Sequence, residues 1–285
     1  MTLTLTRQKN NFERYIRSQG HITTGMNLLG NQIILEQSLI DSYVDHDKPK
    51  ELVDLVTTIE TLTKGGKYEV NSFETDILEE ISQEYAGISN IDKETIQVDY
   101  MVKRYSGMID FSQEQLDDGQ YNLSDFLGKQ IVKLERNTRN RAIGKVLQMG
   151  KHQTASTIDE LKSVVSLINP EHTVSMVLSQ SLFNVLEKLK DNSGNYLLKI
   201  DKATGTTDTF YVNHVLIVDD MTLGGKGDKL AFIGNLEKFV TLFDRKKSTI
   251  SWYSSQNFFG KRLILNTRFD VQKVDADCGY LVTWN

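Results

Sequence analysis

The chain has 285 residues, 25% of them charged, and a formal net charge of −5. This balance excludes a protein whose whole surface binds nucleic acid, although a local basic face remains possible. The single cysteine, Cys278, cannot form an intrachain disulfide, and the sequence shows neither a secretory signal nor an apolar run of about 18 residues. We therefore expect a protein made in a reducing cytoplasm, with no membrane partner.

The first third of the chain is expected to hold an arm, a short helix and a long hairpin. Residues 1–30 are polar, with spaced glycines, and indicate an extended or loosely helical arm that needs a partner to hold it. Apolar residues in 32–44 recur near helical spacing, which predicts a short helix before Pro49. A Lys-Gly-Gly-Lys turn at 64–67 then precedes alternating apolar positions, which predict strands.

An acidic segment separates these strands. Residues 74–94 hold seven Asp and Glu residues against one base, Lys93, and a second alternating strand follows at 96–111. A connection of this length is unusual inside a compact domain and normally has a function, although a solvated surface excursion is the alternative. Among its acids, Glu79, Glu80 and Glu84 are candidates for contact with a partner.

Residues 122–148 have the clearest helical pattern, with Ser124 as a candidate N-cap. The helix is also basic, with six Lys and Arg residues against Asp125 and Glu135. Its face is either simply solvated or in contact with an acidic partner or nucleic acid. The candidates for such contacts are Lys129, Lys133 and Arg136.

The rest of the chain mixes helices and strands. Helices are predicted at 157–168 and 179–191, with Thr157 and Ser179 as N-caps and a strand between them at 173–178. Further strands are expected at 210–218, 229–235, 239–245, 249–253, 261–270 and 280–284. This order predicts an α+β fold.

The sequence has no motif for catalysis, metal binding or phosphate binding. The Gly224–Gly227 stretch lacks the spacing of a phosphate-binding loop and is expected to be a surface turn. No histidine lies three to five residues from another, so no zinc pattern exists, and Cys278 is expected to be a small buried side chain. We therefore expect no cofactor, no metal and no enzymatic activity.

The joint order of these elements resembles the major capsid protein of tailed bacteriophages, which has the Hong Kong 97 type fold. The resemblance covers roughly residues 30–285, including an entry into the long helix at 108–118 and an axial helix and turn at 186–197. The resemblance also includes short sequence motifs: Phe232-Ile-Gly234-Asn235, Phe243-Asp244-Arg245, Asn257-Phe258-Phe259, Arg268-Phe269-Asp270 and Val274-Asp-Ala276.

The resemblance implies a division of the chain into an arm, an extended loop, a peripheral domain with a spine helix, and an axial domain. The expected segments are an N-terminal arm at 1–32, peripheral parts at 33–65, 99–150 and 256–285, an extended loop at 66–98 and an axial domain at 151–255. It further implies that the extended loop lies over a neighbouring subunit, where its acids are expected to meet basic residues such as those of the spine helix. Arg268 and Asp270 are then expected to pair structurally or between subunits rather than to act in catalysis.

The implied function is self-assembly as hexamers and pentamers into an icosahedral shell around double-stranded DNA, which the protein contacts non-specifically. Implied partners are further copies of the chain and a portal protein. Only about thirty residues precede the first helix, so the chain either uses a separate scaffolding protein or has no such aid. The expected location is the virion, after assembly in the cytoplasm of a bacterial host.

Three alternatives stay open at this point. An encapsulin-type bacterial compartment shares the fold and packages an enzyme. An α+β enzyme with an unrecognised site would need polar groups that converge in a pocket. A DNA-binding protein could use the basic helix, against which the net charge of −5 and the acidic segment weigh.

Overall fold

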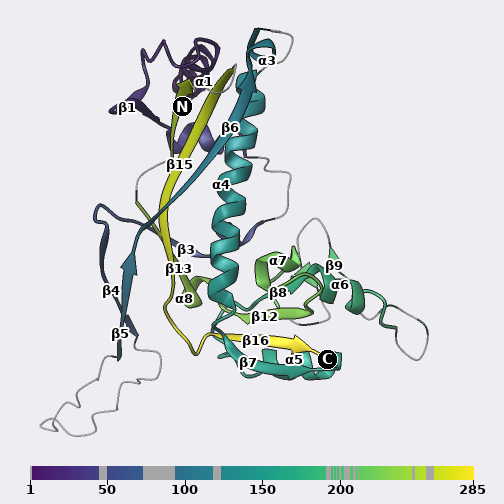
Figure 1. The fold of residues 1–285 in the computed structure, drawn as a ribbon. Coiled ribbons are helices and arrows are strands. Elements are labelled where there is room, and N and C mark those ends of the chain that lie inside the picture. The colour runs from purple at the N-terminus through teal and green to yellow at the C-terminus, as the bar shows by residue number, and fades with distance from the viewer. Residues whose placement is uncertain are drawn as a thin grey trace, which may run out of the picture.

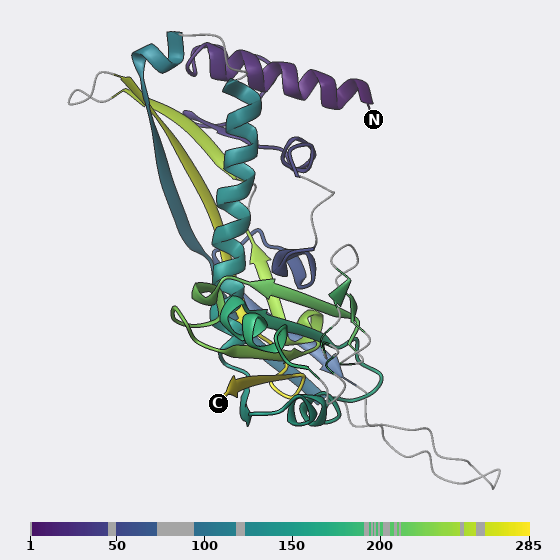
Figure 2. The ribbon, with the colours of Figure 1, turned by 90° about the vertical axis from the view of Figure 1, so that its right-hand side faces the viewer.

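The computed structural model describes most of the chain and places it in an upright unit that stands on a lower, five-stranded sheet (Figures 1 and 2). The described residues are 2–44, 50–72, 94–117, 123–190, 212–245, 248–254 and 260–285, with positions 194, 196, 198, 200–201, 206–207 and 210. Glu79, Glu80 and Glu84 lie outside them.

The upright unit is a long helix against a long sheet. Helix α4 (Leu123–Leu147) runs beside strands β6 (Lys103–Ser112) and β15 (Gly260–Lys273) (Figure 1). The predicted helix at 122–148 is therefore confirmed within one residue at each end. The sheet has the order β1-β2-β14-β15-β13-β3, with β6 also paired to β15. Its other strands are β1 (Asn27–Leu29), β2 (Gln32–Ile34), β3 (Thr57–Glu60), β13 (Val240–Asp244) and β14 (Thr249–Ser254).

Strand β15 explains why the helix lies on only one face of this sheet. Leu263, Leu265 and Phe269 are buried at alternate positions and belong to the clusters that also hold the buried residues of α4. The intervening residues, such as Arg268, are only partly buried and lie on the opposite face. We call this opposite face the outer sheet face.

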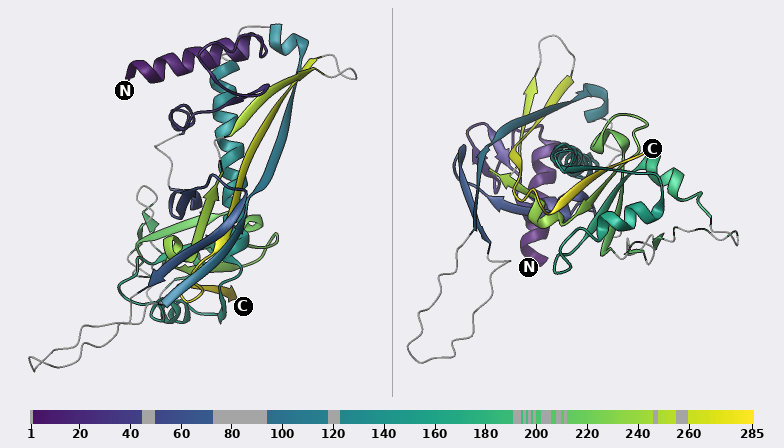
Figure 3. Two further views of the ribbon diagram at one scale, coloured as in Figure 1. Left: turned by 90° about the vertical axis from the view of Figure 1, so that its left-hand side faces the viewer. Right: turned by 90° about the horizontal axis from the view of Figure 1, so that it is seen from below.

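A two-stranded ribbon crosses the lower part of the outer sheet face (Figure 3). Its strands β4 (Gly65–Ser72) and β5 (Glu94–Met101) are antiparallel and flank the acidic segment, as the sequence predicts. The Tyr100 ring stacks on Phe243 of β13 with ring centroids 4.4 Å apart, and Tyr68 meets the same ring edge-on at 5.5 Å. The ribbon is thus anchored to the sheet of its own subunit.

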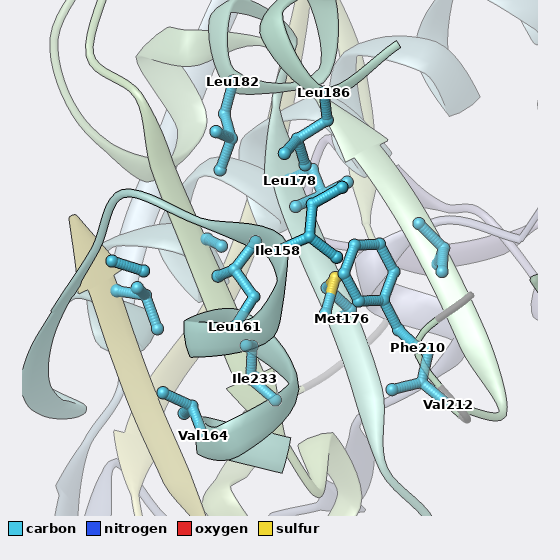
Figure 4. Packing of buried hydrophobic residues seen from close by; sticks show 14 of the residues in the cluster. Ile158, Leu161, Val164, Met176, Leu178, Leu182, Leu186, Phe210, Val212 and Ile233 are labelled. Atoms are coloured by element: carbon cyan, nitrogen blue, oxygen red, sulfur yellow. The ribbon is translucent and has the colours of Figure 1, made fainter. Parts of the chain in front are cut away.

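The lower unit is a five-stranded sheet of order β11-β8-β12-β16-β7. Its strands are β7 (Lys151–Ala155), β8 (Ser175–Ser179), β11 (His214–Val218), β12 (Leu230–Gly234) and β16 (Gly279–Trp284). Helices α5 (Ile158–Val165) and α6 (Gln180–Leu186) pack on it through a core that includes Leu161, Met176 and Leu182 (Figure 4). The predicted caps of these two helices are confirmed, because Thr157 accepts from the Glu160 N–H and Ser179 from the Leu182 N–H. The candidate cap Ser124 is wrong, because α4 already begins at Leu123.

The remaining described elements are helix α1, of 16 residues, and seven short ones. They are α1 (Thr2–Arg17), α2 (Gln37–Asp41), the 3-10 helix η1 (Leu52–Asp54), α3 (Gln113–Asp117), β9 (Ile200–Asp201), β10 (Thr206–Thr207), α7 (Asp220–Leu223) and α8 (Leu236–Phe239). Helix α6 ends at Leu186, several residues before the predicted end at 191.

The N-terminal segment differs from the expected loose arm. It begins with α1, whose Phe12, Tyr15 and Ile16 are buried in a cluster with residues of α2, α4 and the long sheet. Residues 32–44 form β2 followed by α2 rather than one helix. The apolar face of α1 provides the burial that holds a polar helix in place.

The sheets also divide the closing strands differently from the expected segments. Strands β13 and β14 fall within the expected axial segment 151–255 but pair with β15 in the long sheet. Strand β16 falls within the expected peripheral segment 256–285 but completes the five-stranded sheet. The chain therefore passes between the two units again after β12 and after β15, because strand pairing depends on register partners that are distant in sequence.

Candidate subunit-contact surfaces

Two of the three predicted contact residues on α4 already have acidic partners within the chain. The Arg136 guanidinium bonds Glu51, with Nε to Oε2 at 3.1 Å, and also Asp54. Partial burial acts to lower the pKa of Arg136, but the two carboxylates outweigh it and raise that pKa. Lys129 pairs with Asp125 at 3.0 Å, one turn earlier on the helix. Within the described part of the chain, only Lys133 of the three is exposed and without an ionic partner.

A fourth cation of α4, Arg139, lies inside the subunit. Its Nη2 atom bonds Glu135 Oε1 at 2.6 Å and Asp244 Oδ2 at 2.9 Å, and it lies over the Phe269 ring. This group joins α4 to β13 through the centre of the upright unit. Burial raises the pKa of Asp244 to about 6, with Glu135 and Glu60 adding to the rise and Arg139 opposing it.

The predicted pair Arg268 and Asp270 has two different roles. Asp270 is 3% exposed and accepts hydrogen bonds from the Met101 N–H at 2.8 Å and from Gln272 Nε2 at 2.7 Å. It therefore fixes the base of the ribbon within its own subunit, which is a structural pairing. Arg268 lies on the same face without a carboxylate partner among the described residues.

Arginines gather around Arg268 on the outer sheet face. The register places Arg104 of β6 directly opposite Arg268, whereas the next pairs along the strands are complementary. Ser106 donates to Asn266 at 2.6 Å, and Arg262 pairs with Asp110 at 2.8 Å. Like charges directly opposite one another destabilise a sheet, so an external anion at Arg104 and Arg268 would relieve the repulsion.

A third arginine adjoins this pair from the other side of β15. The Arg245 N–H donates to the Arg268 carbonyl at 3.0 Å, and the buried Nε of Arg245 has no hydrogen-bond partner in the structure. We call Arg104, Arg245 and Arg268 the arginine cluster. Sequence reasoning missed it because the three residues come together only through strand register.

The glycine-rich loop is a closed turn. Its Gly225 N–H donates to Asp228 Oδ2 at 2.6 Å, and its Gly227 N–H donates to Asp220 Oδ2 at 3.0 Å. Two amides that a phosphate could have used are thus bound to carboxylates of the chain. This confirms the predicted surface turn.

Cys278 is buried, as expected, but its surroundings are polar. Its Sγ lies 3.0 Å from Asp275 Oδ2 and 3.5 Å from His172 Nδ1. In the described ranges no group of His, Cys, Asp and Glu side chains could hold a metal ion. No helix that the structure describes is long and apolar enough to cross a membrane.

Two open grooves flank α4. One, of about 730 Å³, lies between α4 and the segment around β11 and α7, and Arg141 and Lys145 line it. The other, of about 990 Å³, lies towards α2 and η1, and Lys133 lines it. Lys50 borders both grooves.

Comparisons with known proteins agree with the architecture. The model of the phage capsid family matches residues 34–272. Comparison with curated protein sequences gave no match. The fold is similar to the capsid of an empty GTA particle, with a TM-score of 0.64, 14% identity and coverage of 86% of this chain and 96% of that one.

Two further solved structures share the fold. A structure from Microbacterium phage Oxtober96 has a TM-score of 0.60 at 9% identity, covering 85% of this chain and 93% of the other. A virus-like particle from Pyrococcus furiosus has a TM-score of 0.53 at 10% identity, covering 86% and 97%. At these identities the likeness establishes the fold alone.

Proposed function

Because the chain belongs to the phage capsid family, we propose that it assembles as hexamers and pentamers into a closed icosahedral shell around double-stranded DNA. The family match over residues 34–272 is the observation that carries this proposal. The chain is a structural capsid protein of the Hong Kong 97 type fold and a component of a phage-like particle.

The finer parts of the proposal follow from that role. We propose that the protein has no enzymatic activity, since shell subunits need extended surfaces rather than a pocket. We further propose a portal protein and a separate scaffolding protein as partners, and assembly in the cytoplasm of a bacterial host. The arginine cluster and Lys133 support the role, because both present cations for which the described residues supply no carboxylate partner.

Subunit contact is proposed to run through the outer sheet face. The ribbon is anchored on this face by Tyr68, Tyr100 and the Met101 N–H, so the acidic segment starts from it. Equivalent subunits in a shell present the same face on the same side. We therefore propose that Glu79, Glu80 and Glu84 of one subunit pair with Arg104 and Arg268 of a neighbour. Lys129 and Arg136 are weaker candidates, because their charges are already matched by Asp125, Glu51 and Asp54.

Electron microscopy of the purified full chain tests the proposed function. We expect closed particles of uniform size with fivefold and sixfold clusters, and nuclease-protected DNA when the particles form during phage production. Protein that stays unassembled across salt and concentration contradicts the capsid proposal. Shells that enclose a protein cargo instead of DNA contradict its second half.

A further inference from the structure

The exposed ridge of α4 carries cations that have no ionic partner in the described part of the chain. Four residues at four-residue intervals form it: Lys133, Asn137, Arg141 and Lys145, all exposed. We call them the α4 ridge. At about 1.5 Å per residue they are spaced about 6 Å apart along a helix row and span about 18 Å. None of its three cations has an ionic partner among the residues the structure describes.

The acids around the ridge are already engaged. Five carboxylates border the two grooves that flank it. Glu51 and Asp54 bond Arg136, Asp125 bonds Lys129, Asp41 accepts from Gln37 Nε2, and Asp219 accepts from the Met221 N–H at the start of α7. Lys50, which borders both grooves, has no carboxylate partner in the described ranges.

The buried part of the same helix shows the opposite arrangement. Arg139 points into the subunit and has two carboxylates within 3 Å, Glu135 and Asp244. Among the described residues, the chain thus supplies acids where a cation of α4 is enclosed and supplies no ionic partner along the exposed ridge. A row of unmatched cations beside open grooves suits an extended polyanion from outside the subunit.

Two polyanions could contact the ridge, namely the acidic segment of a second copy and the enclosed nucleic acid, and the position of the ridge distinguishes between them. The acidic segment of a second copy starts from the ribbon, which is anchored on the outer sheet face, and the arginine cluster lies on that face. The buried residues of α4 pack with Leu263, Leu265 and Phe269, on the face of the long sheet opposite the ribbon. The α4 ridge is exposed on this helix, and the helix itself is drawn beside the long sheet in Figures 1 and 3. In a shell one subunit thick, these two faces point to opposite sides.

We propose that the α4 ridge faces the interior of the shell and binds the phosphate backbone of the enclosed double-stranded DNA. This rests on the proposed capsid function. Lys133, Arg141 and Lys145 make the ionic contacts, and the Asn137 amide can donate to a phosphate oxygen between them. Binding through phosphates alone carries no sequence information, which suits a surface that must meet any part of a genome.

Salt-dependent binding of unassembled full-length protein to duplex DNA tests the proposal. The probe is a fluorescent 30-base-pair duplex, used in two unrelated sequences, with the dissociation constant measured by anisotropy at several salt concentrations. Each phosphate contact contributes about 0.9 to the slope of log K against log salt. The variant K133Q/R141Q/K145Q is expected to lower the slope by about 2.7, equally for both sequences.

The matched control removes the same charge from the outer sheet face by neutralising the arginine cluster: R104Q/R245Q/R268Q. We expect it to change the slope by less than about 1. Equal slopes for the wild type and the ridge variant, or equal losses in ridge and control variants, overturn the proposal. If the triple ridge variant fails to fold, as judged by circular dichroism, R141Q alone is used, with an expected loss of about 0.9.

Electron microscopy of the same variants separates this inference from the capsid function. Shells formed by the ridge variant, together with a reduced salt slope, support the inference. A ridge variant that loses shell assembly but keeps the wild-type slope identifies the ridge as a subunit contact and overturns it. A wild type that forms no shells removes the capsid function, whereas the salt slopes still report whether the ridge binds phosphate.

Discussion

Asp244 is expected to make the folding stability of the subunit depend on pH. The carboxylates of Asp244 and Glu135 share one guanidinium, that of Arg139. Glu60 adds further negative charge nearby. Asp244 Oδ1 and Glu135 Oε2 are both buried without a hydrogen-bond partner in the structure. Burial is the largest cause that raises the pKa of Asp244 to about 6, and Arg139 offsets the rise only in part because Glu135 shares the same guanidinium.

The first prediction follows from the sign of that shift. The ordinary pKa of an aspartate is 3.8, so the folded state binds the proton of Asp244 more tightly than the unfolded chain does. The associated stability is fully present below pH 3.8 and is lost as the pH rises through about 6. Asp244→Asn should remove this loss of stability and leave the variant about 3 kcal/mol more stable than the wild type at pH 7.

Urea unfolding of unassembled subunits between pH 4 and 8 measures the difference. The informative quantity is the free energy of unfolding of D244N minus that of the wild type, because other carboxylates titrate in both. D159N is the control, since the Asp159 side chain is 95% exposed. A difference between D244N and wild type that does not change with pH would show that Asp244 titrates normally.

At the scale of elements, the contact between α4 and α7 depends on one glycine. A Cβ atom on Gly144 would lie 2.1 Å from the Thr222 carbonyl oxygen, which is part of the backbone and cannot rotate away. Helix α4 can therefore touch α7 only where it has no side chain. Leu223 and Ile143, on either side of this contact, are fully buried in one cluster.

The second prediction concerns this close approach. Gly144→Ala should lower the free energy of unfolding by about 1–3 kcal/mol, because the helices must separate to admit the methyl group. Gly107→Ala in β6 is the matched control, as its added methyl group meets no atom within 4 Å. Urea unfolding compares the two. Equal stability of both variants would mean that α7 moves without cost.

The strongly periodic elements could be predicted from the sequence, and the partners of those elements could not. The 123–147 helix, the caps Thr157 and Ser179 and the closing strands follow from local spacing and cap chemistry. The sequence pattern of each closing strand predicts that the strand is buried, but it does not predict the sheet to which the strand belongs. The membership of β13, β14 and β16 is decided by register with strands that are distant in the chain.

The candidate contact residues show the same limit. Arg136 looked available on the basic helix, but its partners Glu51 and Asp54 come from η1, more than eighty positions earlier. Asp270 is committed to the Met101 N–H, 169 positions away. In the sequence, Arg104 is a single charge in a strand and has no feature that indicates a contact. Only its position opposite Arg268 makes it a candidate contact residue. Charge alone identifies possible contacts, and folding decides which charges remain free.

At the scale of the whole molecule, the subunit presents two basic faces with different neighbours. The outer sheet face holds the arginine cluster and the anchored ribbon, and the opposite side holds the α4 ridge. The net charge of −5 includes the seven acids of residues 74–94, so the remainder of the chain is close to neutral. A shell contact that pairs the acidic segment with the arginine cluster would leave the ridge for the shell contents.

The last prediction tests this pairing by charge exchange. The variant E79K/E80K/E84K should raise the protein concentration needed for assembly about tenfold, because each exposed ion pair contributes roughly 0–1 kcal/mol. It should also make assembly less sensitive to salt. Adding R104E/R268E to the triple variant restores opposite charges across the contact and should recover much of the loss.

Light scattering against protein concentration measures both the loss and its recovery, with the reversals E171K/E187K in the lower unit as the control. Unchanged assembly in the triple variant contradicts a role for the acidic segment, whereas a loss that R104E/R268E deepens places its partner elsewhere, on residues such as Lys133.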